Sequence, residues 1–417
     1  MTGKERLAAT IRHEEPDQVC VDFGSNAVTG MHVRTVHLLR EHYGLETRPV
    51  KVCEPYQMLG ELEDDLLDQL GIDTEPFNGH GNIFGFRNEN WQPWTAPWGQ
   101  EMLVPADFQV TNDASGDTLI YPQGDRAAPP SGRMPTTGHF FDSIIRQPEI
   151  DEDNLNPEDN LEEFEVMDEA AVDWYRQEAN RLRGSARGII AGTPGTGLGD
   201  IALVPAPFLK QPKGIRDIQE WYISTAIRQD YIHTVFDKQC NIAIENMKLM
   251  NDVAGDVIDV VFTCGTDFGT QTSQFCSIDT YEELWAPYYK RLNGWIHENT
   301  QWKTFKHCCG AVYPLVDHFI DSGFDILNPV QCSATDMDPQ RLKDQFGERI
   351  IFWGGGVDTQ KTLPFGTPDE VYREVRERID IFAPGGGFVF DAIHNVQANT
   401  PIENVVAMFK ALEDARK

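Results

Sequence analysis

From about residue 188 to the C-terminus, short apolar runs alternate with segments of helical length, and this alternation limits the chain to few folds. Each run is bounded by Gly, Asp or Pro, and an amphipathic segment follows it. Parallel strands need a long crossover connection, usually a helix, so the alternation predicts a parallel sheet. The predicted strands are Gly188 to Ala191, Val257 to Cys264, Lys303 to Cys309, Asp325 to Val330, Arg349 to Trp353 and Gly387 to Phe390.

Two of the intervening segments carry helix start signals. Residues Thr367 to Glu370 and Thr400 to Glu403 both have the sequence Thr-Pro-x-Glu. A Thr at the N-cap and a Glu at the third helical position satisfy backbone donors reciprocally, and Pro is tolerated at the first helical position. Both segments therefore predict a helix whose N-cap is the Thr.

Six or more such units in 417 residues favour a closed (β/α)8 TIM barrel, with an open doubly wound sheet as the alternative. We expect residues 1–417 to form one barrel domain. Residues 1–187 are less regular and supply N-terminal helical and loop additions, with a predicted strand at Val19 to Phe23 and a predicted helix at Val33 to Tyr43. Residues 188–417 hold the regular units and are expected to carry the functional site.

The net charge of the chain limits the classes of partner that it is expected to bind. Lys and Arg total 35 against 66 Asp and Glu, which gives a formal net charge of −31. This charge repels nucleic acid phosphates and anionic lipid head groups, so we expect neither nucleic acid nor membrane as a partner. Twelve acids and no base lie between Glu149 and Asp173. This acidic segment is interpreted as a solvated linker or helix face without a chemical role.

The distribution of cysteines and the N-terminal sequence predict the cellular compartment of the protein. Eight cysteines are spread over the chain without the dense spacing of secreted proteins, which predicts reduced thiols in the cytoplasm. The N-terminal segment lacks the apolar core of a signal peptide, and no uncharged apolar run approaches the ~18–20 residues that span a bilayer. A cytoplasmic protein is expected, and the sequence leaves open whether it is a homo-oligomer.

His307 and Cys309 are the clearest candidates for metal ligands in the sequence. In a barrel the active site lies where strands end, and side chains two apart on a strand point to the same side. Imidazole and thiolate suit zinc, which in catalytic sites has three protein ligands and one open position. Either Cys332 or His394, at the ends of two other predicted strands, could complete the set. A buried His and Cys without metal is the alternative.

Two carboxyl groups at strand ends are the acid/base candidates, Asp267 and Asp358. A carboxyl whose pKa is raised by burial can give a proton to a departing heteroatom. Asp after Gly also often caps the following turn, and this capping function is the alternative for both residues. They are therefore predicted as catalytic residues on the condition that they face the site.

Four further residues are candidates for binding substrate. Gln271, Gln331 and Asn395 could orient a substrate through their amide groups, or only brace the loops on which they lie. Trp353 could wall the pocket, or only fill the barrel interior. The sequence does not decide between these alternatives.

The C-terminal half resembles the uroporphyrinogen decarboxylase superfamily, in particular its zinc-dependent, corrinoid-linked methyltransferase branch. The resemblance is specific from about residue 256 to 410 and implies a (β/α)8 barrel with N-terminal helical additions. The segments that carry it are His307-Cys308-Cys309-Gly310, Asn328-Pro329-Val330-Gln331, Met337-Asp338-Pro339, Phe352-Trp353-Gly354-Gly355, His394-Asn395, Thr400 to Val405 and, near the N-terminus, Glu15-Pro16-Asp17.

The resemblance implies a zinc ligand set. Methyltransferases of this branch bind zinc through His-x-Cys and a later Cys that lies just before the Thr-Pro-x-Glu-Asn helix. In this sequence His307 and Cys309 match the first two positions and His394 falls on the third, with Cys332 as the fallback. Imidazole in place of thiolate removes one negative charge and makes the zinc a stronger Lewis acid. Such a site favours a neutral donor or an ether oxygen over a thiol.

The resemblance further implies an activity and a partner. We expect transfer of a methyl group between a small methylated substrate, or an acceptor, and a corrinoid carried on a separate protein, since the chain shows no corrinoid-binding module. The haem-pathway decarboxylase of the same family is disfavoured, because its N-terminal Arg-rich segment is missing here. Two alternatives stay open, a metal-free lyase in which Asp267 stabilises the intermediate, and a non-catalytic binding or scaffold barrel. Methanol, methylamines, methyl thiols and aromatic methyl ethers all remain open as donors.

Overall fold

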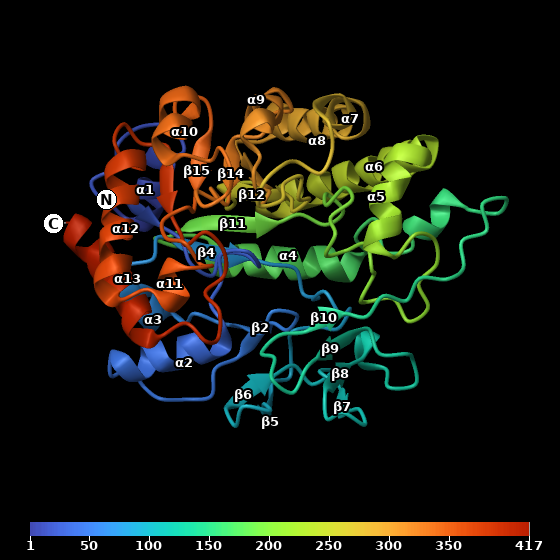
Figure 1. The fold of residues 1–417 in the computed structure, drawn as a ribbon, viewed down its shortest axis with the longest axis horizontal. Helices are drawn as coiled ribbons and strands as arrows, with labels where there is room; N and C mark the ends of the chain where they lie inside the picture. Colours follow the sequence, from blue (N-terminus) through green and yellow to red (C-terminus); the bar gives the residue numbers. More distant parts are fainter. Residues whose placement is uncertain (417) are drawn as a thin grey trace.

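Eight parallel strands form a nearly closed barrel with helices around it in the computed structural model, which describes residues 1–416 (Figure 1). Around the barrel the strands follow the order β1, β16, β15, β14, β13, β12, β11, β4. The predicted (β/α)8 barrel is therefore confirmed, and the open doubly wound sheet is excluded. The strands are β1 (Cys20–Val21), β4 (Thr74–Phe77), β11 (Gly188–Gly192), β12 (Val260–Cys264), β13 (Lys303–His307), β14 (Ile326–Asn328), β15 (Ile351–Trp353) and β16 (Phe388–Phe390).

Helices separate the strands in sequence and cover the outside of the barrel (Figure 1). This arrangement follows from the right-handed crossover between parallel strands. The helices are α1 (Gly3–Thr10), α2 (Val33–His42), α3 (Asp64–Leu70), α4 (Glu169–Leu182), α5 (Ile218–Ile227), α6 (Gln229–Ala254), α7 (Ile278–Leu284), α8 (Ala286–Asn299), α9 (Val316–Asp321), α10 (Pro339–Phe346), α11 (Thr362–Phe365), α12 (Pro368–Phe382) and α13 (Ile402–Ala415).

Alternate residues of the strands fill the barrel interior. One buried cluster takes a single inward residue from most strands, and a second, larger cluster lies between the strands and the helices. Leu7 of α1 joins the interior cluster, and a Cβ atom on Gly188 would lie 2.2 Å from its Cδ2 atom. Helix α1 therefore packs against the start of β11. The interior cluster consists of Leu7, Cys20, Ile190, Val260, Phe305, Ile326, Ile351, Trp353 and Val389.

Asp73 joins the two strands at the ends of the sheet order, β1 and β4. Its backbone N–H donates to Val21 O at 2.8 Å, and its Oδ2 accepts the N–H of Val21 at 2.9 Å. Arg6 of α1 and Arg416, which follows α13, each donate to the same carboxylate at 2.5 Å. Both ends of the described chain are thus tied to the seam where the barrel closes.

The N-terminal part differs from the prediction in two ways. Strand β4 was not predicted, because its sequence Thr-Glu-Pro-Phe is short, polar and interrupted by Pro76; β4 lies at one end of the sheet order, where a missing N–H is tolerated. The region expected to be irregular also contains antiparallel strands below the barrel in Figure 1. They are β2 (Val52–Glu54), β3 (Leu59–Gly60), β5 (Gln92–Thr95), β6 (Glu101–Val104), β7 (Val110–Asn112), β8 (Thr118–Ile120), β9 (Gly132–Met134) and β10 (Asp142–Ser143).

The two helix start signals have different outcomes. Helix α12 begins as predicted, with Thr367 as the N-cap and a reciprocal hydrogen bond pair to Glu370. Helix α13 begins at Ile402 with Pro401 as the N-cap and no side-chain cap, so the prediction for Thr400 is wrong. The N–H of Thr400 instead closes a turn onto Gln397 O at 3.1 Å, and this turn delays the helix start.

The acidic segment from Glu149 to Asp173 is mostly loop and ends within α4. One of its residues has a structural role that the sequence did not predict: Glu163 forms a buried ion pair with Arg216 at 2.8 Å. Within residues 1–416, no helix combines the length and apolar composition that a membrane crossing requires.

Replacing Asp73 by Asn should lower the free energy of unfolding by about 3–5 kcal/mol, because Arg6 and Arg416 would lose their shared partner in a buried setting. Urea denaturation followed by tryptophan fluorescence measures this loss. Asp17→Asn is the matched control, since Asp17 also pairs with Arg6 but its side chain is 37% exposed. The Asp17→Asn control should lower the free energy of unfolding by less than about 1 kcal/mol. Equal losses in the two variants would contradict the role given to Asp73.

Candidate functional site

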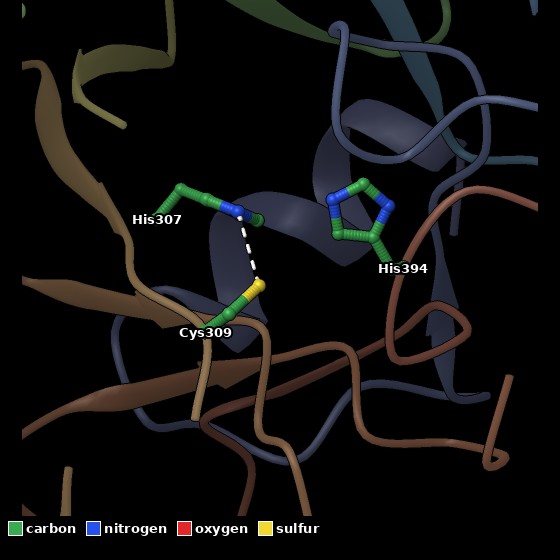
Figure 2. A group of neighbouring side chains, drawn as sticks. All are labelled: His307, Cys309 and His394. Carbon is green, nitrogen blue, oxygen red and sulfur yellow. Dashed lines mark hydrogen bonds between the residues drawn. The ribbon is translucent and has the colours of Figure 1, made fainter. Parts of the chain in front are cut away.

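His307, Cys309 and His394 meet at the carboxyl end of the barrel. Their ligand atoms all lie within 4.8 Å of one another (Figure 2). His307 ends β13, Cys309 follows two residues later, and His394 comes four residues after β16. The Cys309 Sγ atom lies 3.5 Å from His307 Nε2, and the two imidazole rings are 5.5 Å apart between centroids.

Side chains alternate between the two faces of β13, and this alternation points His307 toward the barrel interior. Phe305, two residues earlier, belongs to the interior cluster, whereas Lys306 is buried among the aromatic rings on the outer side of the strand. Gly310 then turns the chain at φ +92°, where a Cβ atom would lie 2.5 Å from the backbone of Gly269. A glycine is therefore needed to end the His-Cys-Cys segment in this direction.

Asn328 fixes the orientation of His307. The Asn328 Nδ2 atom donates to Trp353 O at 3.1 Å, so its Oδ1 atom faces His307 and accepts from Nδ1 at 2.6 Å. The imidazole proton must then be on Nδ1, and the free lone pair of Nε2 faces Cys309. A hydrogen bond of this kind is the usual way in which a metal-binding His is oriented.

His394 is held by its own backbone neighbour. Its Nδ1 atom accepts the N–H of Asn395 at 2.8 Å, which leaves the proton of the neutral ring on Nε2. Figure 2 shows a ring nitrogen of His394 turned toward the other two side chains. Binding of a metal to Nε2 would move the proton to Nδ1 and break the bond to Asn395. The donor set of two imidazoles and one thiol still fits zinc, which prefers N and S ligands.

Burial determines the charge of the three groups. Loss of hydration lowers the pKa of His307 to about 4 and that of His394 to about 4, so both rings are neutral at pH 7. Burial, together with the nearby carboxylate of Asp267, raises the pKa of the Cys309 thiol well above its ordinary value. The three groups are thus uncharged in the free protein, and the two imidazoles already have the neutral charge in which they bind a metal.

Asp267 lies next to the three ligand candidates. Its Oδ1 atom accepts the N–H of Cys309 at 2.6 Å, and burial raises the pKa of its carboxyl group. Asp267 also lines an adjacent cavity of about 160 Å³. Aromatic and hydroxyl side chains make up much of the remaining wall, including Tyr222, Thr225, Thr266, Phe268 and Trp285. The predicted acid/base candidate therefore lies between the ligand cluster and a space that can admit a small molecule.

Asp358 and Cys332 lie elsewhere. The Asp358 carboxylate accepts the N–H of Gln360 at 2.7 Å and of Lys361 at 3.3 Å, which is the capping alternative given above. The Cys332 thiol donates to Val330 O at 3.4 Å and is close to the charges of α12. Neither residue belongs to the cluster of metal-ligating groups found within residues 1–416, so their predicted functions receive no support from this arrangement.

The amide candidates all brace loops. Gln331 accepts the N–H of Gly310 at 2.8 Å and donates to Gln271 Oε1 at 2.9 Å, which connects the loops after β12, β13 and β14. Asn395 accepts the N–H of Gly30 at 2.5 Å and donates to Ala27 O at 2.8 Å. These bonds occupy the amides in the protein alone, which favours the bracing function over direct substrate binding.

Trp353 fills the barrel. It is fully buried, and its ring packs at 72° against that of Phe305, with 5.3 Å between centroids. Its Nε1 atom donates to Asp22 at 2.9 Å. Of the two alternatives for this residue, the structure favours the filling of the barrel.

Sequence reasoning missed three residues of this region, Asn328, Asp22 and Lys306. Asn328 follows the inward-facing Ile326 by two residues, and this spacing places it on the interior side of the strand. Asp22 could have been found in the same way, two residues after Cys20. Lys306 Nζ is buried and donates to Thr266 O at 2.5 Å, and no sequence pattern identified that partner.

One solved structure is similar to almost the whole length of the chain. A methyltransferase from Methanosarcina mazei aligns with 99% of this chain and 99% of its own, with a TM-score of 0.54 and 14% sequence identity. At this identity the likeness shows a shared fold. A GH113 β-1,4-mannanase aligns with 57% of this chain and 78% of its own at 11% identity, and its TM-score of 0.27 is too low to support an argument.

Sequence comparison finds one family model that is similar to the C-terminal part of the chain. No curated protein sequence matched the chain. Residues 209–415 match the family described as Uroporphyrinogen decarboxylase (URO-D), and they include β12 to β16 with His307, Cys309 and His394. This match agrees with the resemblance derived from the sequence. Residues 209–415 of this chain are therefore similar to the uroporphyrinogen decarboxylase (URO-D) family.

Proposed function

We propose that this protein is a zinc-dependent methyltransferase that moves a methyl group between a small methylated substrate, or an acceptor, and a corrinoid protein. The observation that carries the proposal is the convergence of His307, Cys309 and His394 within 4.8 Å at the carboxyl end of the barrel. Barrel enzymes place their active sites at this end. The fold shared with a methyltransferase is in agreement with the proposal.

In this proposal His307, Cys309 and His394 hold the zinc. When bound there, zinc would act as a Lewis acid on the heteroatom that gains or loses the methyl group. Asn328 keeps His307 in the tautomer that can bind metal, and Asp267 fixes the backbone of Cys309 through the 2.6 Å hydrogen bond. The cavity beside Asp267 is the proposed entry for the small substrate.

The corrinoid is proposed to come from a separate protein that docks at the carboxyl end of the barrel. The net charge of −31 would favour a partner with a basic docking face, because opposite charges accelerate association. Salt screens such steering, so the transfer rate with a fixed amount of partner should fall as ionic strength rises.

His307→Ala, Cys309→Ala and His394→Ala should each lose stoichiometric zinc, whereas Cys332→Ala should keep it. Elemental analysis of the purified proteins measures the zinc content. Cys276→Ala is the matched control, since its thiol is half-buried and outside the cluster. Loss of zinc in Cys332→Ala alone would show that Cys332 is the third ligand. Absence of zinc from the wild-type protein after growth with zinc would favour the metal-free lyase.

Zinc binding at pH 7 should release about one proton. His307 and His394, with pKa values lowered to about 4, have no proton to lose, whereas the thiol of Cys309, whose pKa is raised, must lose one. The zinc affinity should therefore rise about tenfold per pH unit between pH 6 and 8. Titration against a competing chelator measures it. Cys309→Ser should remove most of this dependence, and release of two or more protons would contradict the neutral histidines.

Methyl transfer itself is the direct test. The zinc-loaded protein, mixed with a reduced corrinoid protein and a methylated donor, should methylate the corrinoid, which visible absorption detects. His307→Ala should reduce the rate by at least ~100-fold, because the metal would be lost. Asn180→Ala, on the exposed face of α4, is the control and should leave the rate unchanged. Failure with methanol, methylamines, methyl thiols and aromatic methyl ethers alike would contradict the proposed function.

A further inference from the structure

Helix α5 turns two isoleucines toward solvent and buries two hydroxyl side chains. Ile223 and Ile227 are 45% and 65% exposed, whereas Ser224 and Thr225 are buried beside Trp221. The two buried hydroxyl groups donate back to carbonyl oxygens of their own helix, at 2.6 and 2.7 Å. A surface helix of a globular protein usually has its apolar stripe against the core and its polar residues outside. The outward face of α5 therefore needs an explanation other than packing within this chain.

The exposed residues of α5 form one uncharged stripe along the helix, because they recur at positions i, i+4, i+7 and i+8. They are Gln219, Ile223, Ala226 and Ile227. Phe275, in the loop after β12, extends the stripe, since its ring stacks on that of Tyr222 with 4.9 Å between centroids and is 47% exposed. We call Ile223, Ala226, Ile227 and Phe275 the α5 patch. A contiguous exposed apolar surface of this kind is typical of an interaction site.

The α5 patch lies at the rim of the cavity beside Asp267. Tyr222 and Thr225 of α5 line this cavity, and so does Phe275. Phe275 is therefore both a wall of the cavity and a part of the exposed patch, which makes the two continuous. Figure 1 shows α5 at the opposite end of the barrel from α1, which packs against the start of β11. A molecule bound to the patch would thus lie beside the cavity at the carboxyl end of the barrel.

Acidic side chains border the α5 patch. Asp230 follows Ile227 by three residues, and Asp279 follows Phe275 by four. Both are exposed, and neither carboxylate has an ion-pair partner in residues 1–416. Arg228 lies beside them in the sequence, but two glutamates pair with it. The patch therefore has an apolar centre and a negative border, and an apolar core with a polar rim is the usual anatomy of a protein interface.

This border distinguishes between the occupants that an apolar patch could have. A second copy of this chain would bring the same acidic residues, and a net charge of −31, against the patch. Like charges placed across an interface are costly, so self-association is disfavoured. Anionic lipid head groups would be repelled for the same reason. The surface fits a different protein, one with an apolar centre and basic residues around it.

We propose that the α5 patch is the docking surface for the corrinoid protein, with Ile223 and Ile227 as its apolar anchors and with Asp230 and Asp279 at its charged rim. This inference rests on the proposed function, in which a corrinoid protein docks at the carboxyl end of the barrel. It adds which side of that end the partner contacts, namely α5 and the loop after β12. Docking there places the partner beside the cavity that Asp267 lines.

A transfer assay with two acceptors tests the docking surface. One acceptor is a reduced corrinoid protein of the same organism, and the other is free reduced cobalamin, which needs no protein contact. The double variant Ile223→Ser, Ile227→Ser should raise the KM for the corrinoid protein at least ~10-fold, because central apolar anchors carry much of the affinity of an interface. The rate with free cobalamin and the zinc content should stay within about twofold of the wild type, since neither isoleucine lines the cavity.

Two further variants control for exposure and for charge. Phe365→Ser removes an apolar side chain that is 84% exposed on α11, far from α5 in Figure 1, and should leave both KM values unchanged. The double variant Asp230→Asn, Asp279→Asn should raise the KM for the corrinoid protein and weaken its dependence on ionic strength, because charges at the rim act mainly on association. Asp369→Asn, exposed on α12, should do neither.

Three results would overturn the inference. The first is an unchanged KM for the corrinoid protein in the double isoleucine variant. The second is an equal loss with both acceptors, which would mean that the variant damages the site itself. The third is a wild-type protein that is dimeric in sedimentation analysis and becomes monomeric in the double isoleucine variant, because the patch would then belong to a second copy of this chain.

The two proposals can fail separately. A wild-type protein that transfers methyl groups to both acceptors, with a double isoleucine variant that behaves in the same way, overturns the docking surface alone. Transfer to free cobalamin but not to the corrinoid protein also overturns it. A wild-type protein that methylates neither acceptor overturns the proposed function, and the docking surface with it.

Discussion

One chain of hydrogen bonds crosses the barrel interior, and the arrangement of the site depends on it. It runs from His307 to Asn328, from Asn328 to the carbonyl oxygen of Trp353, and from the indole of Trp353 to Asp22. Each member is buried and belongs to a different strand or strand end, so a change in the register of any strand would break the chain. The chain fixes the tautomer of His307 and at the same time supplies a donor to a buried carboxylate. The orientation of His307 and the hydrogen bonding of Asp22 therefore depend on the same chain of contacts.

Burial gives this interior its chemical character. The two imidazoles and the thiol are neutral in the free protein because ionisation in a low-dielectric interior is costly. A divalent cation would reverse this balance for the thiol by supplying the missing positive charge. Asp267 lies at the border, in contact with the backbone of Cys309 and with the adjacent cavity. The interior therefore combines a neutral ligand set with an approach for a small molecule.

The regular half of the chain was predictable, and the reasons are local. Apolar strands and the capping box at Thr367 depend on interactions between residues close in sequence, so their signals are strong. Strand β4 escaped prediction because a strand of four residues with Pro76 is formed by its pairing with β11, a long-range contact. For the same reason Asp358 and Asp267 could not be told apart. Both lie a few residues after the end of a strand, but the Asp358 carboxylate turns back onto its own loop and the Asp267 carboxylate reaches the N–H of Cys309.

The sequence by itself determined the strand and helix alternation, the barrel class, and the His-x-Cys pair at the end of β13, because these follow from patterns along a single segment. Only the tertiary structure decided that His394 and not Cys332 approaches this pair, and that Trp353 fills the barrel and donates to Asp22. These outcomes depend on barrel closure, in which Asp73 joins β1 to β4 and β1 pairs with β16, which lies more than 300 residues later in the sequence. The direction of a side chain after a strand ends is set by such distant contacts, which no local pattern encodes.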